Sequence, residues 1–370
     1  MKRLLLGSTA LIAAGFIAGS ADAAEKITLG VGGYYRAAFG VVNEDDDTFD
    51  AGDNRRSHDL AQDAEVHFKG STKLDNGIEV GARIELEGAS GVGDPIDERY
   101  INFKGAFGEV RIGDDDDGRK QATTGYAPSP TPNTFGVNSP AFTFNNAGAG
   151  HITQSVSTFR SLENDSAKVI YFTPAVQGFR FIGSYAPDAT QDRTGFGTSA
   201  NNNCNQSSEA LAGGVSYSGE LNGVKVNGGG GYGTADREDG CAPGAQLDDP
   251  EFISAGIILG FGAIQVGGSI LLIEDGPVLG VPMDESTEFD IGGTYALDGG
   301  VLVGGGWGRG EYSRMGGGED TLNHYQAGAS MPIGPGISVE AFVGYFNYNA
   351  ALGLAGNNGW QAGVGTGLSF

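Results

Sequence analysis

Basic residues are scarce in this sequence, which holds 22 lysines and arginines against 46 aspartates and glutamates. The formal net charge is −24 at pH 7. A protein that binds nucleic acid needs a surplus of Lys and Arg to displace counterions from phosphate groups. The composition therefore excludes nucleic acid as an expected partner. The chain is not disordered either, because 39% of its residues are hydrophobic and 20 are phenylalanine.

Long apolar runs are absent after the first two dozen residues. Residues 1–3 are a short basic start, residues 4–19 are apolar, and residues 21–23 supply the small side chains that precede a cleavage point. This pattern is typical of a secretory signal peptide and predicts cleavage after Ala23. No later stretch reaches the ~18 consecutive apolar residues of a membrane helix. We therefore expect a signal peptide over 1–23 and one exported domain over 24–370, without a helical span.

Cysteine is almost absent as well. The only two, Cys204 and Cys241, are 37 positions apart, and no CxxC or nearby histidine gives them metal-ligand spacing. In the oxidising compartment that export implies, the pair is compatible with one disulfide. It is equally compatible with two unpaired thiols in loops, and the sequence leaves both states open.

Recognisable catalytic motifs are also missing. The four histidines are scattered without HExxH or another metal spacing, and neither GxSxG nor the phosphate-binding GxxxxGK[ST] occurs. The tetraglycine 228–231 falls within an expected strand, where close backbone packing explains it better than a phosphate cradle. We therefore expect no enzyme and no cofactor.

What the sequence does have is 66 glycines and a persistent alternation of apolar with small or polar residues. In residues 358–370 every second residue from Trp360 to Phe370 is apolar or threonine, and the residues between are glycine, Gln or Ser. In residues 78–87 the apolar positions alternate with Arg83 and several glutamates. Such charges would be costly in a dry core. Period two with one apolar and one wet face predicts strands between lipid and a water-filled lumen.

Turn residues divide the chain into sixteen segments with this alternation. The predicted strands are 27–41, 58–74, 77–88, 97–104, 107–113, 167–174, 178–186, 208–218, 222–235, 251–260, 262–274, 286–297, 299–312, 321–332, 336–349 and 358–370. Short Gly- and Asn-rich turns alternate with long loops, which are 42–57, 88–97, 113–167, 186–208, 235–251, 274–286, 312–321 and 349–358. Short turns at one end and long loops at the other are typical of outer-membrane barrels. The predicted fold class is all-β, a transmembrane antiparallel β-barrel of about 16 strands.

The third long loop, about 114–166, is far longer than the others. It opens with four consecutive aspartates and contains Pro128, Pro130, Pro132 and Pro140, which prevent regular strand pairing. A connection of this length within a compact domain is usually functional. We expect it to fold into the barrel and narrow the hole.

The chain resembles a Gram-negative general porin of the alphaproteobacterial type. The resemblance rests on residues 26–36 as a first strand, on the hairpin 98–113 before the long loop, on residues 168–179 after it, and on the terminal Phe370, which resembles the family's assembly signal. It implies a sixteen-stranded homotrimer in the outer membrane of a Gram-negative bacterium, with the third loop folded inward. Its surroundings would be outer-membrane lipid and lipopolysaccharide.

Charged residues on the inward faces indicate where the hole is narrowest. Arg83 and Arg111 each lie about five residues beyond a short turn, which places them roughly 12 Å up the barrel. They are expected to form a basic stripe with Lys69, His67 and Arg36. The aspartates that begin the long loop would face this stripe across the hole; they are Asp114, Asp115, Asp116 and Asp117. The competing interpretation is that the arginines form ordinary ion pairs with Glu85, Glu87 and Glu109.

Three functions remain open at this stage. The first is a channel for passive diffusion of small hydrophilic solutes and ions, with a modest cation preference that the acidic composition favours. The others are a substrate-selective channel or adhesive barrel, and an outer-membrane barrel enzyme. The acidic loops, such as 44–47, offer oxygen ligands to Ca²⁺ or Mg²⁺, but a solvated face bridged by such ions to lipopolysaccharide phosphates explains them better.

Overall fold

The computed structural model of this 370-residue chain describes residues 26–44, 56–88, 96–134, 136–138, 155–163, 165–189, 206–238, 248–278, 281–351 and 356–370. The expected signal peptide, Cys204, Cys241 and the acidic residues 45–47 lie outside these ranges, so the predictions about them stay predictions. No helix in the described part of the chain is long and apolar enough to span a membrane.

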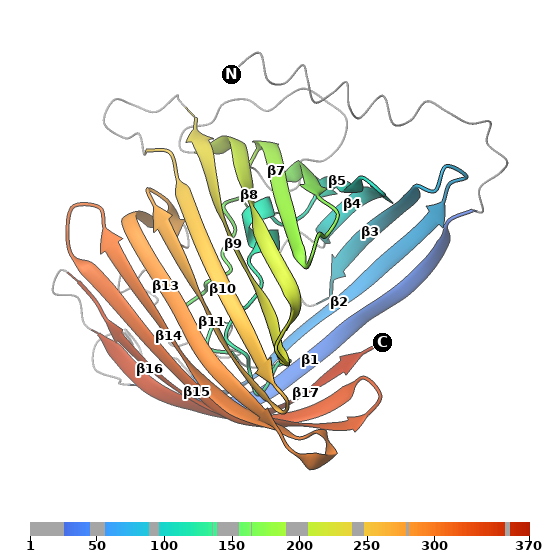
Figure 1. The fold of residues 1–370 in the computed structure, drawn as a ribbon. Coiled ribbons are helices and arrows are strands. Elements are labelled where there is room, and N and C mark those ends of the chain that lie inside the picture. The colour runs from blue at the N-terminus through green and yellow to red at the C-terminus, as the bar shows by residue number, and fades with distance from the viewer. Residues whose placement is uncertain are drawn as a thin grey trace.

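Antiparallel strands dominate the described residues. They are β1 (Thr28–Glu44), β2 (His58–Lys73), β3 (Glu79–Glu87), β4 (Ile96–Gly105), β5 (Gly108–Asp114), β6 (Ala167–Phe172), β7 (Phe179–Asp188), β8 (Ser207–Leu221), β9 (Val224–Arg237), β10 (Glu251–Phe261), β11 (Ile264–Glu274), β12 (Pro277–Val278), β13 (Val281–Ala296), β14 (Leu302–Arg314), β15 (Glu319–Gly334), β16 (Ile337–Asn349) and β17 (Asn357–Ser369). Apart from the two-residue β12, each strand pairs with its neighbours in sequence, and β1 pairs with β17 (Figure 1). The described strands thus form a closed ring of sixteen, which confirms the predicted barrel.

Two of the long loops contain more pairing than the sequence predicted. Within 274–286 the chain forms a small hairpin in which Val278 pairs with Val281, so that β13 begins five residues before the expected position 286. The segment expected as a loop over 312–321 is instead a tight turn between Arg314 and Glu319. Its glycines Gly316, Gly317 and Gly318 have φ of 88°, 104° and 92°, a backbone region that other residues rarely adopt. Because of them the two flanking strands extend further than predicted.

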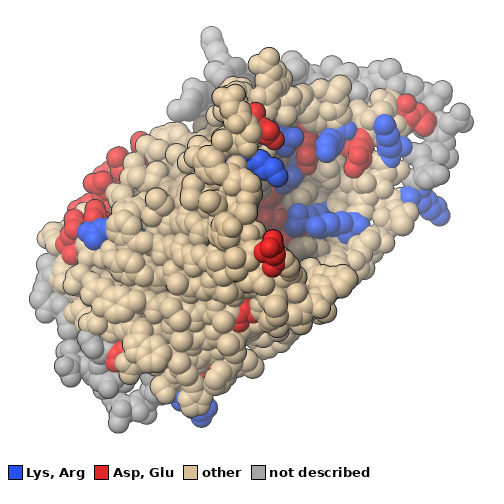
Figure 2. Space-filling model, turned by 60° about the horizontal axis from the view of Figure 1, so that its bottom comes forward, with Lys and Arg blue, Asp and Glu red and all other residues tan. Residues whose placement is uncertain are grey.

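The alternating apolar residues of the strands face away from the lumen. Leu29 on β1 and Val364 on β17 are 62% and 59% exposed, whereas the alternate residue Gln361 is buried. Figure 2 shows a broad, largely uncharged outer surface, with Lys, Arg, Asp and Glu gathered in a hollow and a second, mostly acidic group along the left edge. A barrel in a bilayer needs this inverted arrangement, since lipid replaces the dry core as the apolar environment.

Several aromatic residues lie on this outer surface. Tyr35, Phe39, Tyr295 and Trp360 are 43–48% exposed. Trp307 is half-buried, because it stacks on Tyr325 at 6.3 Å between ring centroids. Rings with one apolar and one polar end suit the boundary between lipid and water.

The third long loop enters the barrel, as Figure 1 shows for the helix α2 (Gly118–Ala122) and the segment after it. The helix contacts β7, β8, β9 and β10. Asp117 is its N-cap and accepts a hydrogen bond from the Lys120 backbone N at 2.8 Å. A helix of this length gains little from propensity, so the cap and the wall contacts hold it in place.

Glycines on the inner wall allow the loop to lie directly against the strands. A Cβ added at Gly229, Gly256, Gly292, Gly328 or Gly365 would approach, in that order, Ala122, Gly125, Pro128, Thr131 or Thr134 within 3.0 Å. These loop residues recur every third position while the wall glycines advance from β9 to β17. The loop therefore lies against the part of the inner wall formed by β7 to β17, and these five wall glycines have a packing role.

Candidate functional site

The infolded loop is fixed to the wall by buried polar contacts. Arg119 is fully buried and donates to Ser254 Oγ on β10 at 2.8 Å, and Thr134 donates to Glu340 on β16 at 2.6 Å. The backbone N–H of Ala127 and the side chains of Asn138 and Thr158 donate to Asp290 on β13, at 2.5–2.8 Å. Because these anchors lie on β10 to β16, the described part of the loop leaves the wall of β1 to β5 facing the lumen.

A second set of anchors centres on Glu288 of β13. The side chain of Arg160, near the end of the loop, binds Glu288 at 2.9 Å, and Tyr312 donates to the same carboxylate at 2.6 Å. Glu288 and Tyr312 are fully buried. Sequence reasoning missed these residues. The sequence does show acidic residues at inward-facing positions of several C-terminal strands. It does not show that the loop covers them.

The β1–β5 wall, named here the open wall, brings most of the predicted basic residues side by side. Lys69 lies directly opposite Arg83, and Arg83 lies opposite Tyr100. Arg111 lies opposite Asn102 on β4, and its guanidinium stands 4.8 Å from the Tyr100 ring centroid. Lys69, Arg83 and Tyr100 line one open pocket of this wall together with Glu109.

The arginines of the open wall are all paired with carboxylates. Arg36 donates to Asp63 at 2.7 Å. Arg83 forms an ion pair with Glu85, and Arg111 binds Glu109 at 2.8 Å. Two of the three pairs expected under the competing interpretation are therefore present. Glu87, the third acid named there, has no ion pair with the described residues.

The four aspartates do not stand across the hole from the arginines, which corrects that part of the prediction. Asp114 binds Arg99 on the neighbouring strand β4 at 2.6 Å, and Asp115 binds Arg111 itself at 3.0 Å. Asp116 binds Lys120 at 2.5 Å, and Asp117 caps α2. Asp114, Asp115 and Asp117 are at most 3% exposed. The reason is their position: the run begins at the last residue of β5, where the chain leaves the wall that carries Arg111.

Burial perturbs the carboxyl groups where the loop begins and ends. Desolvation raises the pKa of Asp115, against the lowering effect of Arg111. Desolvation, with the nearby Asp116, raises the pKa of Asp165 to about 6. Burial likewise raises the pKa of Glu163, which lies 3.7 Å from the Lys168 ammonium. The two ends of the loop thus share a compact charged base beside the open wall.

The structure also locates two more of the predicted site residues, His67 and Phe370. His67 lies on the open wall, with its Nε2 atom 2.7 Å from a Glu65 carboxylate oxygen. Phe370 follows β17, and its backbone exchanges hydrogen bonds with Gly33 of β1 at 3.0 and 3.1 Å. Its side chain is 63% exposed on the outer surface. The C-terminus therefore takes part in closing the barrel, and its role as an assembly signal stays a prediction.

A closed barrel with an apolar outside, a charged open wall and a loop folded into its lumen defines a transmembrane channel protein. The chain matches the Gram-negative porin family over residues 7–351, and it belongs to that family. It is accordingly an outer-membrane protein that forms a water-filled channel for passive diffusion of small hydrophilic solutes.

Solved structures of several other proteins have the same fold. An anion-selective porin from Comamonas acidovorans is 17% identical, with a TM-score of 0.63 over 93% of this chain and 100% of that one. The trimer form of OmpT, an outer membrane protein of Vibrio cholerae, is 14% identical, with a TM-score of 0.58 over 94% and 100%. A mutant of the Rh. blastica porin is 17% identical, with a TM-score of 0.53 over 93% and 100%. At these identities the likeness concerns the fold alone. None of the curated proteins compared matches this chain.

Proposed function

We propose that solutes cross this channel between the open wall and the infolded loop, and that the channel modestly prefers cations. The observation that carries the proposal is the pairing of every arginine on the open wall with a carboxylate, as in Arg36–Asp63 and Arg83–Glu85. Glu65 and Glu87, which lie opposite each other on β2 and β3, are acids beyond those pairs. With the lysines included, the strands β1 to β5 hold eleven acids and seven basic residues, so the wall is net acidic, as is the whole chain with its formal charge of −24.

Reversal potentials across a KCl gradient in planar bilayers test this selectivity. Glu87→Gln should lower the cation preference, because it removes an acid that no arginine neutralises. Arg83→Gln should raise it, because Glu85 then loses its partner. Both effects should weaken at high salt, since ions screen the wall charges. If the two variants shift the reversal potential in the same direction, or not at all, the open wall does not set the selectivity.

A passive channel, not a barrel enzyme or a channel specific for one substrate, fits this wall best. Its described arginines are engaged in ion pairs with carboxylates, and His67 contacts Glu65 and not a serine of the described wall. Single-channel conductance distinguishes a channel from an enzyme. Liposome swelling, with competition by individual sugars and amino acids, distinguishes general from specific diffusion.

The proposed assembly is a homotrimer that contacts outer-membrane lipid and lipopolysaccharide. Small outward residues support it: Ala37 on β1 lies directly opposite Thr366 on β17, and Gly33 and Ala362 belong to the same pair of strands. Small residues allow two barrels to approach closely where lipid would otherwise sit. An unheated sample should migrate above the monomer in SDS gels and shift to it on boiling. A monomer in the unheated lane would contradict the trimer.

A further inference from the structure

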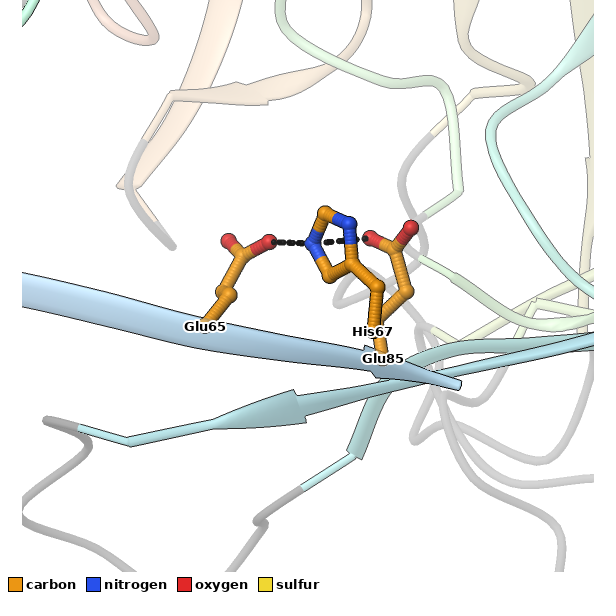
Figure 3. Close-up of side chains that lie close together, drawn as sticks. All are labelled: Glu65, His67 and Glu85. Carbon is orange, nitrogen blue, oxygen red and sulfur yellow. Dashed lines mark hydrogen bonds and ion pairs between the residues drawn. The ribbon is translucent and has the colours of Figure 1, made fainter. Parts of the chain in front are cut away.

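Three side chains that bind metal ions in other proteins converge on the open wall (Figure 3). They are Glu65 and His67 on β2 and Glu85 on β3. His67 lies directly opposite Glu85 in the strand register. Its Nε2 atom is 2.7 Å from Glu65 Oε2 and 3.7 Å from Glu85 Oε2. One nitrogen and two carboxylate oxygens all lie within 4.8 Å of one another.

Each carboxylate is held by a neighbour through its other oxygen. The Tyr34 hydroxyl on β1 donates to Glu65 Oε1 at 2.5 Å. The Arg83 guanidinium pairs with Glu85 Oε1. These contacts leave Oε2 of both glutamates turned toward His67. Outer partners of this kind orient metal ligands in known sites, and they are present here before any ion is bound.

Burial adds a second argument that is independent of the spacing. The side chains of Glu65, His67 and Glu85 are 13%, 15% and 5% exposed. Glu85 Oε2 makes no hydrogen bond, since its contact with His67 is beyond hydrogen-bond length. Two carboxylates this far removed from water would be stabilised by a further cation. Gly32, which lies opposite His67 on β1, has no side chain to cover the ring.

We propose that Glu65, His67 and Glu85 bind a divalent transition-metal ion of the Zn²⁺ type in the channel lumen. Two ligand atoms of a tetrahedral zinc ion are about 3.3 Å apart, and the observed 2.7 and 3.7 Å bracket that separation. The ion takes the place of the proton on His67 Nε2, which is released to the lumen water. Water supplies the fourth ligand.

The histidine decides which metals suit the site. Imidazole favours Zn²⁺, Cu²⁺ and Ni²⁺, whereas sites built only of carboxylates favour Ca²⁺ and Mg²⁺. An all-carboxylate group, Glu65 with Glu87 and Asp97, adjoins the cluster and shares Glu65 with it. Competition between Zn²⁺ and Ca²⁺ therefore tests whether His67 is a ligand. Arg83 does not block the ion, because it pairs with the oxygen of Glu85 that faces away from His67.

Calorimetric titration of ZnCl₂ into the EDTA-treated, detergent-solubilised protein tests the binding. We expect one Zn²⁺ per chain, lost in His67→Gln and retained in the matched control His58→Gln, a histidine at the start of the same strand and outside the cluster. Tyr34→Phe keeps all three ligands and removes only the hydrogen bond to Glu65. It should weaken binding by about 10- to 100-fold. Circular dichroism and heat-dependent gel mobility identify any variant that has not folded.

The outcomes that overturn the proposal are equally definite. The proposed site is wrong if the wild-type protein binds no Zn²⁺. It is also wrong if His67→Gln binds Zn²⁺ as tightly as the wild type does. Ca²⁺ that displaces Zn²⁺ at equal concentration, and binds His67→Gln unchanged, would assign the ion to the carboxylates instead.

A second readout concerns the pore. Micromolar Zn²⁺ should reduce the cation preference of the wild-type channel and of His58→Gln, but not of His67→Gln, because a bound ion adds positive charge to the acidic wall. This readout rests on the proposed selectivity, whereas the titration does not, so failure of one is distinguishable from failure of the other.

Discussion

A close backbone contact between the infolded loop and the barrel wall gives a sharp prediction about Gly256. A Cβ at this position of β10 would stand 2.5 Å from the Gly125 carbonyl oxygen, whereas ordinary contact begins at 3.4 Å. Gly256→Ala therefore pushes the loop inward by the difference, 0.9 Å, toward the open wall. Overpacking of this kind costs about 1–3 kcal/mol. We expect lower stability and a smaller single-channel conductance.

Gly30→Ala is the matched control for this substitution. Gly30 also faces the lumen from a strand, but it lies on the open wall, and its added Cβ would meet only the Lys69 carbonyl oxygen at 3.5 Å. Because alanine suits a strand better than glycine, this control should gain about 0.5–1 kcal/mol. The two variants should then differ by about 1.5–4 kcal/mol in the free energy of unfolding.

Urea unfolding in detergent or liposomes measures the stability, and planar-bilayer recordings measure the conductance. The conductance is the decisive readout, since the Cβ at position 256 would also lie 3.0 Å from Ser269 of the barrel itself. If Gly256→Ala matches Gly30→Ala in both measurements, the loop does not rest on β10, and the description of the open wall as the conducting path fails with it.

Two further substitutions probe the outer surface and the loop anchors. Val364→Arg places a charge on an outward position that is 59% exposed, and it should cost about 2–4 kcal/mol in liposome refolding if the residue meets lipid at midplane; unchanged refolding would contradict the parity assignment. Glu288→Gln leaves Arg160 without its buried partner and should cost about 3–5 kcal/mol. The double variant with Arg160→Met should recover part of that loss in the same unfolding assay, and a double variant as unstable as the single one would argue against this pair as a loop anchor.

The strands and their orientation were predictable from the sequence. Period-two alternation separates Val364 from Gln361 with no knowledge of their neighbours, because lipid and water lie on opposite sides of every strand. Residues that favour the backbone conformations of turns, such as glycine and asparagine, mark the ends of the strands, and they too are recognised from the local sequence alone. The tight turn at Gly316 was missed because a run of glycines also fits a long loop.

The pairing within the open wall was predictable only in part. The inward parity of Arg83 and Arg111 follows from strand spacing, and so does the chance that they meet Glu85 and Glu109, two residues along the same strand. The cluster around His67 required the register between β2 and β3, which brings Glu85 opposite it. Sequence periodicity fixes which face a side chain takes, but not which residue of the next strand it meets.

The path of the infolded loop was decided by tertiary structure alone. The sequence shows a long, proline-bearing loop that begins with four aspartates, but not that Asp115 turns back to Arg111 or that Gly125 rests on Gly256. The contact of Gly125 with Gly256 joins residues separated by more than a hundred positions, and it exists only because the closed barrel presents a wall of inward glycines and buried acids such as Glu288. Alternation along a strand is a local property that the chain carries with it, whereas the site where a loop comes to rest depends on surfaces that exist only after the barrel has closed.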